Sequence, residues 1–177
     1  MNRLRKPFSR EEYLQNDLPG KILVSRFLSH SFENTKEYKD VYEILNFDED
    51  KKCGDVKVRN KITGEILRHE VEVPASKRFQ ILWNRVYADL SCTSKAWYQA
   101  SNGFHFLVDQ FDTHQNGLPN KLIIVKIQDI IDHGSTQYRK AKNNSDKENF
   151  IHIDWKYTKF LSLNEQGTKY GIKRFSY

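Results

Sequence analysis

Three carboxylates, Asp55, Glu70 and Glu72, are spaced so that a short piece of chain could bring them together. Glu70 and Glu72 stand two residues apart in a segment that alternates polar and apolar side chains, so in a β-strand both point to one face. Like charges in a partly dry site raise one another's pKa, and a divalent cation removes that cost. The spacing indicates a metal site; the alternative is a solvated acidic face of a sheet.

The element expected to position these carboxylates is a β-hairpin over residues 55–73. Its two alternating arms are joined by Asn60, Lys61, Thr63 and Gly64, which are turn-forming residue types. If the arms pair through this turn, Asp55 lies within a few residues of the level of the Glu-X-Glu pair. The alternating apolar residues of the second arm then line the opposite face.

The order of elements around the hairpin resembles the core of the PD-(D/E)XK nuclease superfamily, the restriction-endonuclease-like fold. An apolar-periodic helix over 21–31 and a β-rich strand over 38–47 precede the hairpin, and a helix over 77–90 follows it. The resemblance covers roughly residues 19–131 by order of elements, with motif content at the three carboxylates alone.

The resemblance implies that Asp55 and Glu70 bind Mg²⁺ or Mn²⁺. In the superfamily a Lys two residues after the second acidic position helps the attacking water, whereas this chain has Glu72 there. That is a departure from the motif, and Glu72 would either ligate the metal or orient the water. Lys57, on the strand and face of Asp55, and Lys77, after the hairpin, are the two alternatives for the missing positive charge.

The implied fold is α/β (α+β): one domain with a central mixed β-sheet flanked by helices and an additional C-terminal β segment. A chain of 177 residues fits a single domain. Further strands are expected over 97–100, 104–108 and 122–127, with Asn102 and Gly103 at positive φ in a turn, and a last helix from near Gln128. The expected divisions are a basic arm with a short helix ended by Leu18-Pro19-Gly20 at 1–18, a nuclease-like core at 19–132, a flexible polar loop at 133–150 and a β extension at 151–177.

The charge of the chain favours polyanionic partners. The formal net charge is +6 and the sequence pI is about 9.2, which suits nucleic acid. The basic arm and the polar loop could follow phosphates or be merely solvated. The cations expected to contact nucleic acid are Arg3, Arg5, Lys6, Arg78, Arg85, Arg139, Lys140, Lys142, Lys173 and Arg174.

Several classes of protein are disfavoured. Cys53 and Cys92 lack zinc-site spacing, and two cysteines suit a reducing, cytoplasmic setting. No signal peptide or bilayer-spanning run is present, so no membrane partner is expected. His105 and His114 lack a catalytic partner at a defined spacing and are expected to be structural or surface residues.

The leading hypothesis is a Mg²⁺-dependent endonuclease that hydrolyses nucleic acid, with DNA favoured. The alternative is a non-catalytic module on the same fold that binds nucleic acid or a protein, including a virus or mobile-element protein that interferes with host defence. The oligomeric state stays open, and a homodimer is one alternative because cleavage of both strands by one-site nucleases often needs a dimer.

Overall fold

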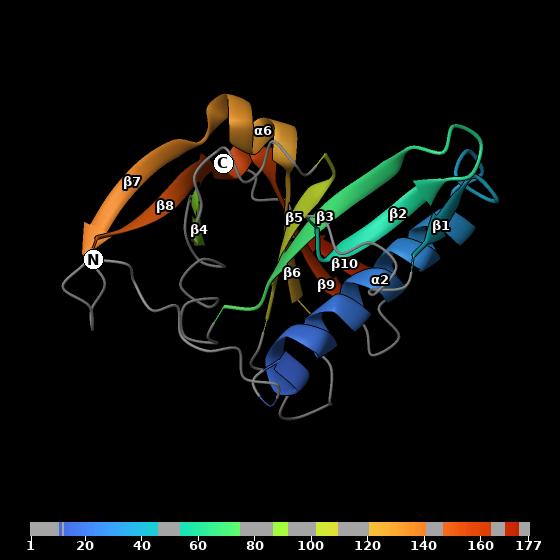
Figure 1. The fold of residues 1–177 in the computed structure, drawn as a ribbon, viewed down its shortest axis with the longest axis horizontal. Coiled ribbons are helices and arrows are strands. Elements are labelled where there is room, and N and C mark those ends of the chain that lie inside the picture. Colours follow the sequence, from blue (N-terminus) through green and yellow to red (C-terminus); the bar gives the residue numbers. More distant parts are fainter. Residues whose placement is uncertain are drawn as a thin grey trace.

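The computed structural model describes residues 11, 13–45, 54–74, 87–91, 102–109, 121–140, 147–163 and 169–173. Within these ranges the protein is a mixed α/β fold, as expected, with a seven-stranded and a three-stranded sheet (Figure 1). The larger sheet has the order β1 (Tyr42–Ile44), β2 (Val56–Asn60), β3 (Ile66–Glu72), β5 (Phe104–Val108), β6 (Lys121–Lys126), β9 (Thr158–Leu163) and β10 (Lys169–Lys173). The smaller has the order β4 (Tyr87–Ser91), β8 (Lys147–Asp154) and β7 (Ser135–Lys140).

Two apolar clusters sit on opposite faces of the central sheet. Helix α2 (Leu18–Glu33) buries Leu23 and Val24 against one face, and α6 (Ile127–His133) buries Ile130 on the other, together with residues of β8. The two faces follow from alternation, because successive side chains of β5 and β6 belong to different clusters. The central strands are therefore covered on both faces.

Helix α2 starts earlier than expected. The interruption predicted at Leu18-Pro19-Gly20 is wrong: a π-helical turn, η1 (Tyr13–Asp17), leads directly into α2, and Pro19 stands in its first turn. Proline is tolerated there because the first helical N–H groups have no partner within the helix. A Cβ on Gly20 would lie 2.6 Å from the Val73 side chain, so the glycine permits close approach to the sheet.

The predicted hairpin is confirmed as β2 and β3, which pair antiparallel from Val56 opposite His69 to Arg59 opposite Ile66. Asn60 Oδ1 accepts the N–H groups of Ile62 and Thr63 within the connecting turn. Gly64 has a φ of 74°, which a glycine adopts without strain.

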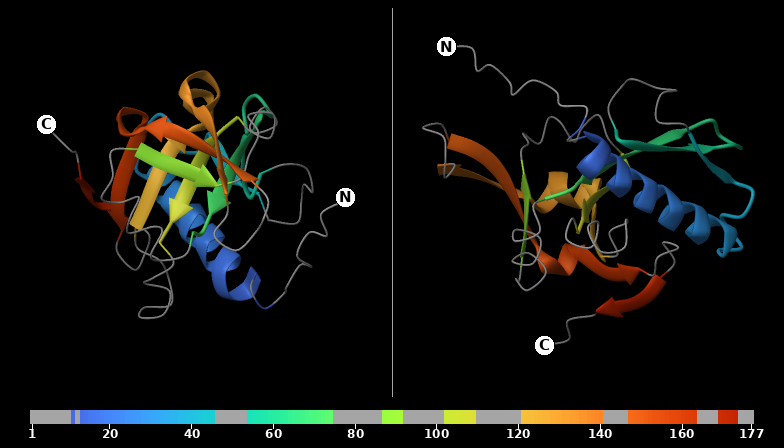
Figure 2. Two further views of the ribbon diagram at one scale, coloured as in Figure 1. Left: turned by 90° about the vertical axis from the view of Figure 1, so that its left-hand side faces the viewer. Right: turned by 90° about the horizontal axis from the view of Figure 1, so that it is seen from below.

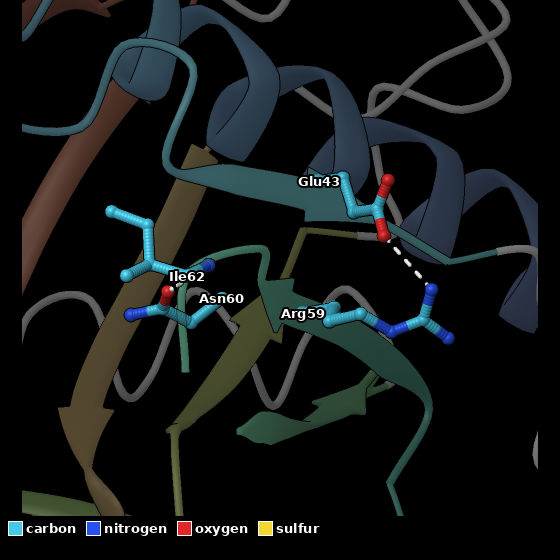
Figure 3. A network of polar contacts seen from close by, with 4 residues as sticks. All are labelled: Glu43, Arg59, Asn60 and Ile62. Atoms are coloured by element: carbon cyan, nitrogen blue, oxygen red, sulfur yellow. Dashed lines mark hydrogen bonds and ion pairs between the residues drawn. The ribbon is translucent and has the colours of Figure 1, made fainter. Parts of the chain in front are cut away.

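Strand β1 extends the hairpin to three strands. It pairs antiparallel with β2, and an ion pair of 2.9 Å joins Glu43 to Arg59 across the two strands (Figure 3). Residues 46 and 47 of the strand predicted over 38–47 lie outside the described ranges, and residues 42–44 form β1. The preceding residues form turns in which Tyr38 N–H donates to Thr35 and Asp40 has a φ of 66°, which breaks an extended chain.

Strands β3 and β5 pair in parallel, with Glu70 opposite His105. The helix predicted over 77–90 is wrong at its end, since Tyr87–Ser91 form β4 and pair with β8; residues 77–86 lie outside the described ranges. The strand predicted over 97–100 also lies outside them. Strands β5 and β6 and helix α6 agree with prediction.

Two predictions about the loops are corrected. Gly103 does not have positive φ; its requirement is space, because a Cβ there would lie 2.5 Å from His69 Nδ1. The stretch 133–150, expected to be a flexible loop, contains β7 and the start of β8, paired from Ser135 opposite His152 to Lys140 opposite Lys147. The polar composition of this stretch did not predict a strand, because the strand is held by backbone pairing.

The chain after residue 150 completes both sheets. Strand β8 ends at Asp154, a 3₁₀ turn η2 (Trp155–Tyr157) follows, and β9 pairs antiparallel with β6. Strand β10 then pairs with β9 at the edge. None of the described helices has the length and apolar run needed to cross a lipid bilayer.

Candidate functional site

Three ionisable side chains are buried on neighbouring strands in the middle of the central sheet. Lys57 of β2, Glu70 of β3 and His105 of β5 are 4%, 8% and 4% exposed. Their immediate neighbours along each strand pack in the cluster under α2, so alternation turns these three toward the opposite face. The pairing of Glu70 with His105 places two of them side by side.

Glu72 belongs to the same row. Its Oε2 lies 3.2 Å from His105 Nε2, and its side chain is partly buried. Glu70 and Glu72 thus share a face, as their spacing predicts. The alternative of a solvated acidic face is wrong for Glu70, which is buried.

Asp55 lies just before β2, at the level of Glu70. Its backbone N–H donates to the carbonyl of His69 at 2.7 Å, and its Oδ2 accepts the N–H of Val71 at 2.9 Å. Asp55 is therefore hydrogen-bonded to both residues that flank Glu70. This agrees with the register expected from the hairpin.

The second carboxylate oxygen of Asp55, Oδ1, forms an ion pair with a lysine of helix α2. Lys21 Nζ lies 2.8 Å from Asp55 Oδ1, with side-chain exposures of 16% and 30%. The Asp55 carboxylate is thus drawn toward α2, whereas Glu70 and Glu72 project from the other face. Among the described residues no group of three or more His, Cys, Asp or Glu side chains is close enough to hold a metal ion.

Lys57 is the cation of the buried row. It is opposite Arg68 in the register, two residues along the strands from the level of Asp55 and Glu70. In the part of the chain that the structure describes, no carboxylate is within ion-pair distance of its ammonium. Glu70 is its diagonal neighbour on the same face of the sheet.

His69 is a buried group that the sequence did not single out. Its Nδ1 accepts the N–H of Phe104 at 3.0 Å, its ring stacks on Phe104, and Gly103 lies against it. The buried Nε2 has no hydrogen-bond partner among the described residues, and burial lowers the pKa of His69 to about 4. A neutral imidazole therefore ties β3 to β5 next to Glu70.

Most of the predicted nucleic-acid contacts cannot be placed. Arg139 and Lys140 end strand β7 and Lys173 ends β10, where the backbone alone is described. The other predicted residues lie outside the described ranges: Arg3, Arg5, Lys6, Lys77, Arg78, Arg85, Lys142 and Arg174.

Sequence reasoning missed the roles of Lys21 and His69. Lys21 is more than thirty residues from Asp55 in the sequence, and no spacing rule links a helical lysine to a strand carboxylate. The sequence signal for His69 was its position. It lies two residues from both Leu67 and Val71, so it points to the same face of β3 as these residues, toward the core under α2.

Comparison with protein-family models, curated proteins and solved structures finds no match for this chain. The chemistry of the site has to be argued from its own residues. Its carboxylate oxygens are the ligands that Mg²⁺ and Mn²⁺ prefer, and Asp55 already binds a cation, the Lys21 ammonium. Mg²⁺ is commonly held by one or two carboxylates together with substrate phosphates, but the described residues bring no three such donors together, and the Asp55 carboxylate turns toward α2.

Proposed function

We propose that the protein is a divalent-metal-dependent endonuclease that hydrolyses phosphodiester bonds of nucleic acid, with DNA the favoured substrate. The observation that carries this proposal is the row of buried Lys57, Glu70 and His105 with the partly buried Glu72 beside it. Burying an ion costs on the order of several kcal/mol, and an apolar strand would be more stable. Ionisable groups buried together on one face of a sheet make that face a candidate functional site.

The order of elements supports a restriction-endonuclease-like core for this function. Helix α2, then β1, then β2 beginning just after Asp55, and then β3 with its two glutamates follow one another as the resemblance implies. The next strand of the sheet, β5, runs parallel to β3.

In this proposal Asp55, once released from Lys21, and Glu70 would hold Mg²⁺ or Mn²⁺, and Glu72 would add a ligand or orient the attacking water. The metal, when bound, supplies positive charge at the phosphoryl oxygen and lowers the pKa of water. Lys57 stabilises the negative charge that develops on the phosphate. Of the two lysines, Lys57 is a described residue and lies on the same sheet face as Glu70, whereas Lys77 lies outside the described ranges.

The same proposal assigns nucleic-acid binding to the basic surface. In Figures 1 and 2 the β7–β8 ribbon reaches away from the central sheet, and β4 pairs with residues 150–154 of β8. Arg139, Lys140 and Lys147 belong to the outer part of the ribbon. A two-stranded ribbon fits the major groove of duplex DNA.

The test is titration of Mn²⁺ into the wild type, Glu70→Gln and Asp55→Ala, with DNA and RNA cleavage measured on the same samples. Wild-type protein is expected to bind Mn²⁺ and to cleave. Both variants should lose Mn²⁺ binding and at least about 100-fold in cleavage rate. Glu65→Gln is the matched control, since Glu65 is exposed in the same hairpin. Full cleavage by Glu70→Gln with an intact fold contradicts the assignment.

A second function, a non-catalytic nucleic-acid-binding module, is favoured by one contact. Lys21 gives Asp55 a counter-charge without any metal. This alternative predicts that the protein binds nucleic acid equally well in Mn²⁺ and in EDTA, and that Glu70→Gln leaves binding unchanged. Metal-dependent cleavage would exclude it.

A further inference from the structure

Lys57 is a buried cation with no carboxylate at ion-pair distance among the described residues. We propose that Lys57 and Arg68 form a binding site for a phosphate group of the nucleic-acid backbone, and that this site works without a metal ion. The inference rests on the proposed function for the source of the phosphate. It adds Arg68 to the residues that contact the substrate, and its test needs neither metal nor cleavage.

The side chain of Lys57 is packed against the sheet except at its tip. Val56 and Val58 on either side of it belong to the cluster under α2, so Lys57 projects from the opposite face, where it is 4% exposed. The fully buried polar atoms without a partner in the described ranges are Ser25 Oγ and His69 Nε2. The Lys57 nitrogen has no described partner either, so it is not fully buried, and an anion from solvent can reach it.

Arg68 is the second donor of the site. It stands opposite Lys57 in the register of β2 and β3, and such cross-strand partners share a face with their Cβ atoms roughly 5 Å apart. A Cβ on Gly54 would lie 2.8 Å from the Arg68 Cβ, so the chain before β2 lies against the base of the arginine side chain. Its Nη1 is 3.4 Å from the Ile66 carbonyl, a long contact that uses one of five N–H donors.

The nearby carboxylates of this face do not neutralise Lys57. Glu43 is paired with Arg59 at 2.9 Å (Figure 3), and Glu72 lies 3.2 Å from His105. Neither carboxylate is at ion-pair distance from the Lys57 ammonium. An anion that binds beside Lys57 therefore meets a positive charge that these two glutamates have not cancelled.

A phosphate group suits this pair of donors. Lysine binds phosphate as a compact charge with three donors, and arginine binds it through a planar fork. The attraction is screened less at an ammonium with a buried stem than at an exposed lysine. The net charge of +6 draws polyanions toward the protein, and a nucleic-acid backbone presents phosphate groups in a row.

The alternative role for Lys57 is to neutralise Glu70, its diagonal neighbour on the same face. Removing one partner of a buried ion pair destabilises a fold, because the other charge stays buried without compensation. The counter-ion role alone predicts that Lys57→Met melts at a lower temperature than the wild type and that phosphate stabilises neither protein. The phosphate site predicts that phosphate stabilises the wild type and that Lys57→Met loses this response.

The experiment measures thermal unfolding in EDTA, in sodium phosphate and in sodium chloride of equal ionic strength. At phosphate about ten times its Kd, the wild type should melt about 3–6 °C higher than in chloride. Lys57→Met should lose this rise, and Arg68→Met should bind phosphate about tenfold more weakly. Lys61 is exposed in the turn of the same hairpin, so Lys61→Met has the same change in charge and should keep the wild-type rise.

Duplex DNA distinguishes a backbone phosphate from free phosphate as the ligand. In EDTA, Lys57→Met should bind a short duplex about fivefold more weakly than the wild type, and inorganic phosphate should compete with the duplex for the wild-type protein. Unchanged DNA affinity in Lys57→Met, with the phosphate response of the wild type intact, would overturn the backbone as the source and leave a site for free phosphate.

Equal melting of the wild type in phosphate and chloride overturns the inference, as does a phosphate response that persists in Lys57→Met. Either result leaves the nuclease proposal standing, since that proposal is decided by Mn²⁺ binding and cleavage. If Lys57→Met fails to fold, Arg68→Met decides the question, because wild-type phosphate affinity in that variant contradicts the two-residue site.

Discussion

The neutral imidazole of His69 links the site to the stability of the fold. It accepts a hydrogen bond from the Phe104 N–H, while its own Nε2 is buried and has no partner in the part of the chain that the structure describes. Placing a proton on Nδ1 would break the bond to β5 and bury a charge between aromatic rings. This histidine therefore acts as a structural group whose protonation opposes folding.

The effect of pH on stability follows from the lowered pKa of His69, about 4 against 6.5 for an ordinary histidine. The unfolded chain takes up a proton near pH 6.5 and the folded protein near pH 4. Its contribution to the unfolding free energy is thus full above pH 6.5 and falls as the pH drops to 4. The loss is about 3 kcal/mol, measurable by urea unfolding at pH 7.5 and pH 4.5.

The variant that isolates this effect is His69→Asn, which keeps an acceptor for the Phe104 N–H. It should be less stable than the wild type at pH 7.5, because the ring leaves a cavity, but should lose less stability than the wild type toward pH 4.5. His133→Asn, which changes an exposed histidine of α6, is the control. Equal pH dependence in the wild type and His69→Asn would refute the assignment.

For individual residues, prediction succeeded where the alternation of side chains along a strand decides which face each one occupies. The shared face of Glu70 and Glu72 and the level of Asp55 followed from period-two geometry and one turn. The Lys21–Asp55 pair and the buried state of Lys57 could not be predicted in this way. They depend on where α2 crosses the sheet, which no local pattern encodes.

The β7–β8 ribbon is the element that the sequence described least well. Residues 138–149 are polar and charged, with few apolar side chains to signal a strand. Isolated two-stranded ribbons are only marginally stable in water. Here the end of β8 also pairs with β4, and this pairing stabilises one end of the ribbon. A strand held by its neighbours leaves little trace in local composition.

Salt dependence tests the ribbon as a nucleic-acid contact. The triple variant Arg139→Gln, Lys140→Gln, Lys147→Gln should bind duplex DNA more weakly. The slope of log K against log salt concentration should fall by up to about 3, since each lost phosphate contact contributes about 0.9. Fluorescence anisotropy between low and moderate salt measures the slope.

The matched control removes the same charge from the opposite end of the molecule. Lys36, Lys39 and Lys61 are exposed in the turns near β1 and the β2–β3 hairpin. Their triple Gln variant should keep the wild-type slope to within about 1. Equal slopes for the two triple variants would show that net charge, and not the ribbon, governs binding.

For the whole molecule, the class of fold could be predicted from the sequence, whereas the pairing of strands distant in the sequence could not. Alternating arms, a continuous apolar strand and an apolar helix face predicted a mixed sheet with helices. The pairing of β9 with β6 and of β4 with β8 joins segments more than thirty residues apart. Such pairings are chosen by global packing, so β8 and β9 could not be assigned to different sheets from their own residues.

The parallel pairing of β3 with β5 also sets how the chain has to fold. The hairpins β2–β3 and β5–β6 close short loops, whereas joining β3 to β5 closes the loop from Glu72 to Phe104 and costs more entropy. We expect the hairpins to form before this junction. In stopped-flow refolding, Val58→Ala should slow folding, while Phe106→Leu should mainly accelerate unfolding.

The reverse pattern of rates would place the junction in the folding nucleus. If the hairpins do form first, the row of Lys57, Glu70 and His105 is assembled at the last step, when β5 docks on β3. The side chains of the row then stay hydrated until most of the sheet exists, so the cost of dehydrating them falls on the docking step that follows the main folding barrier, and not on the earliest collapse.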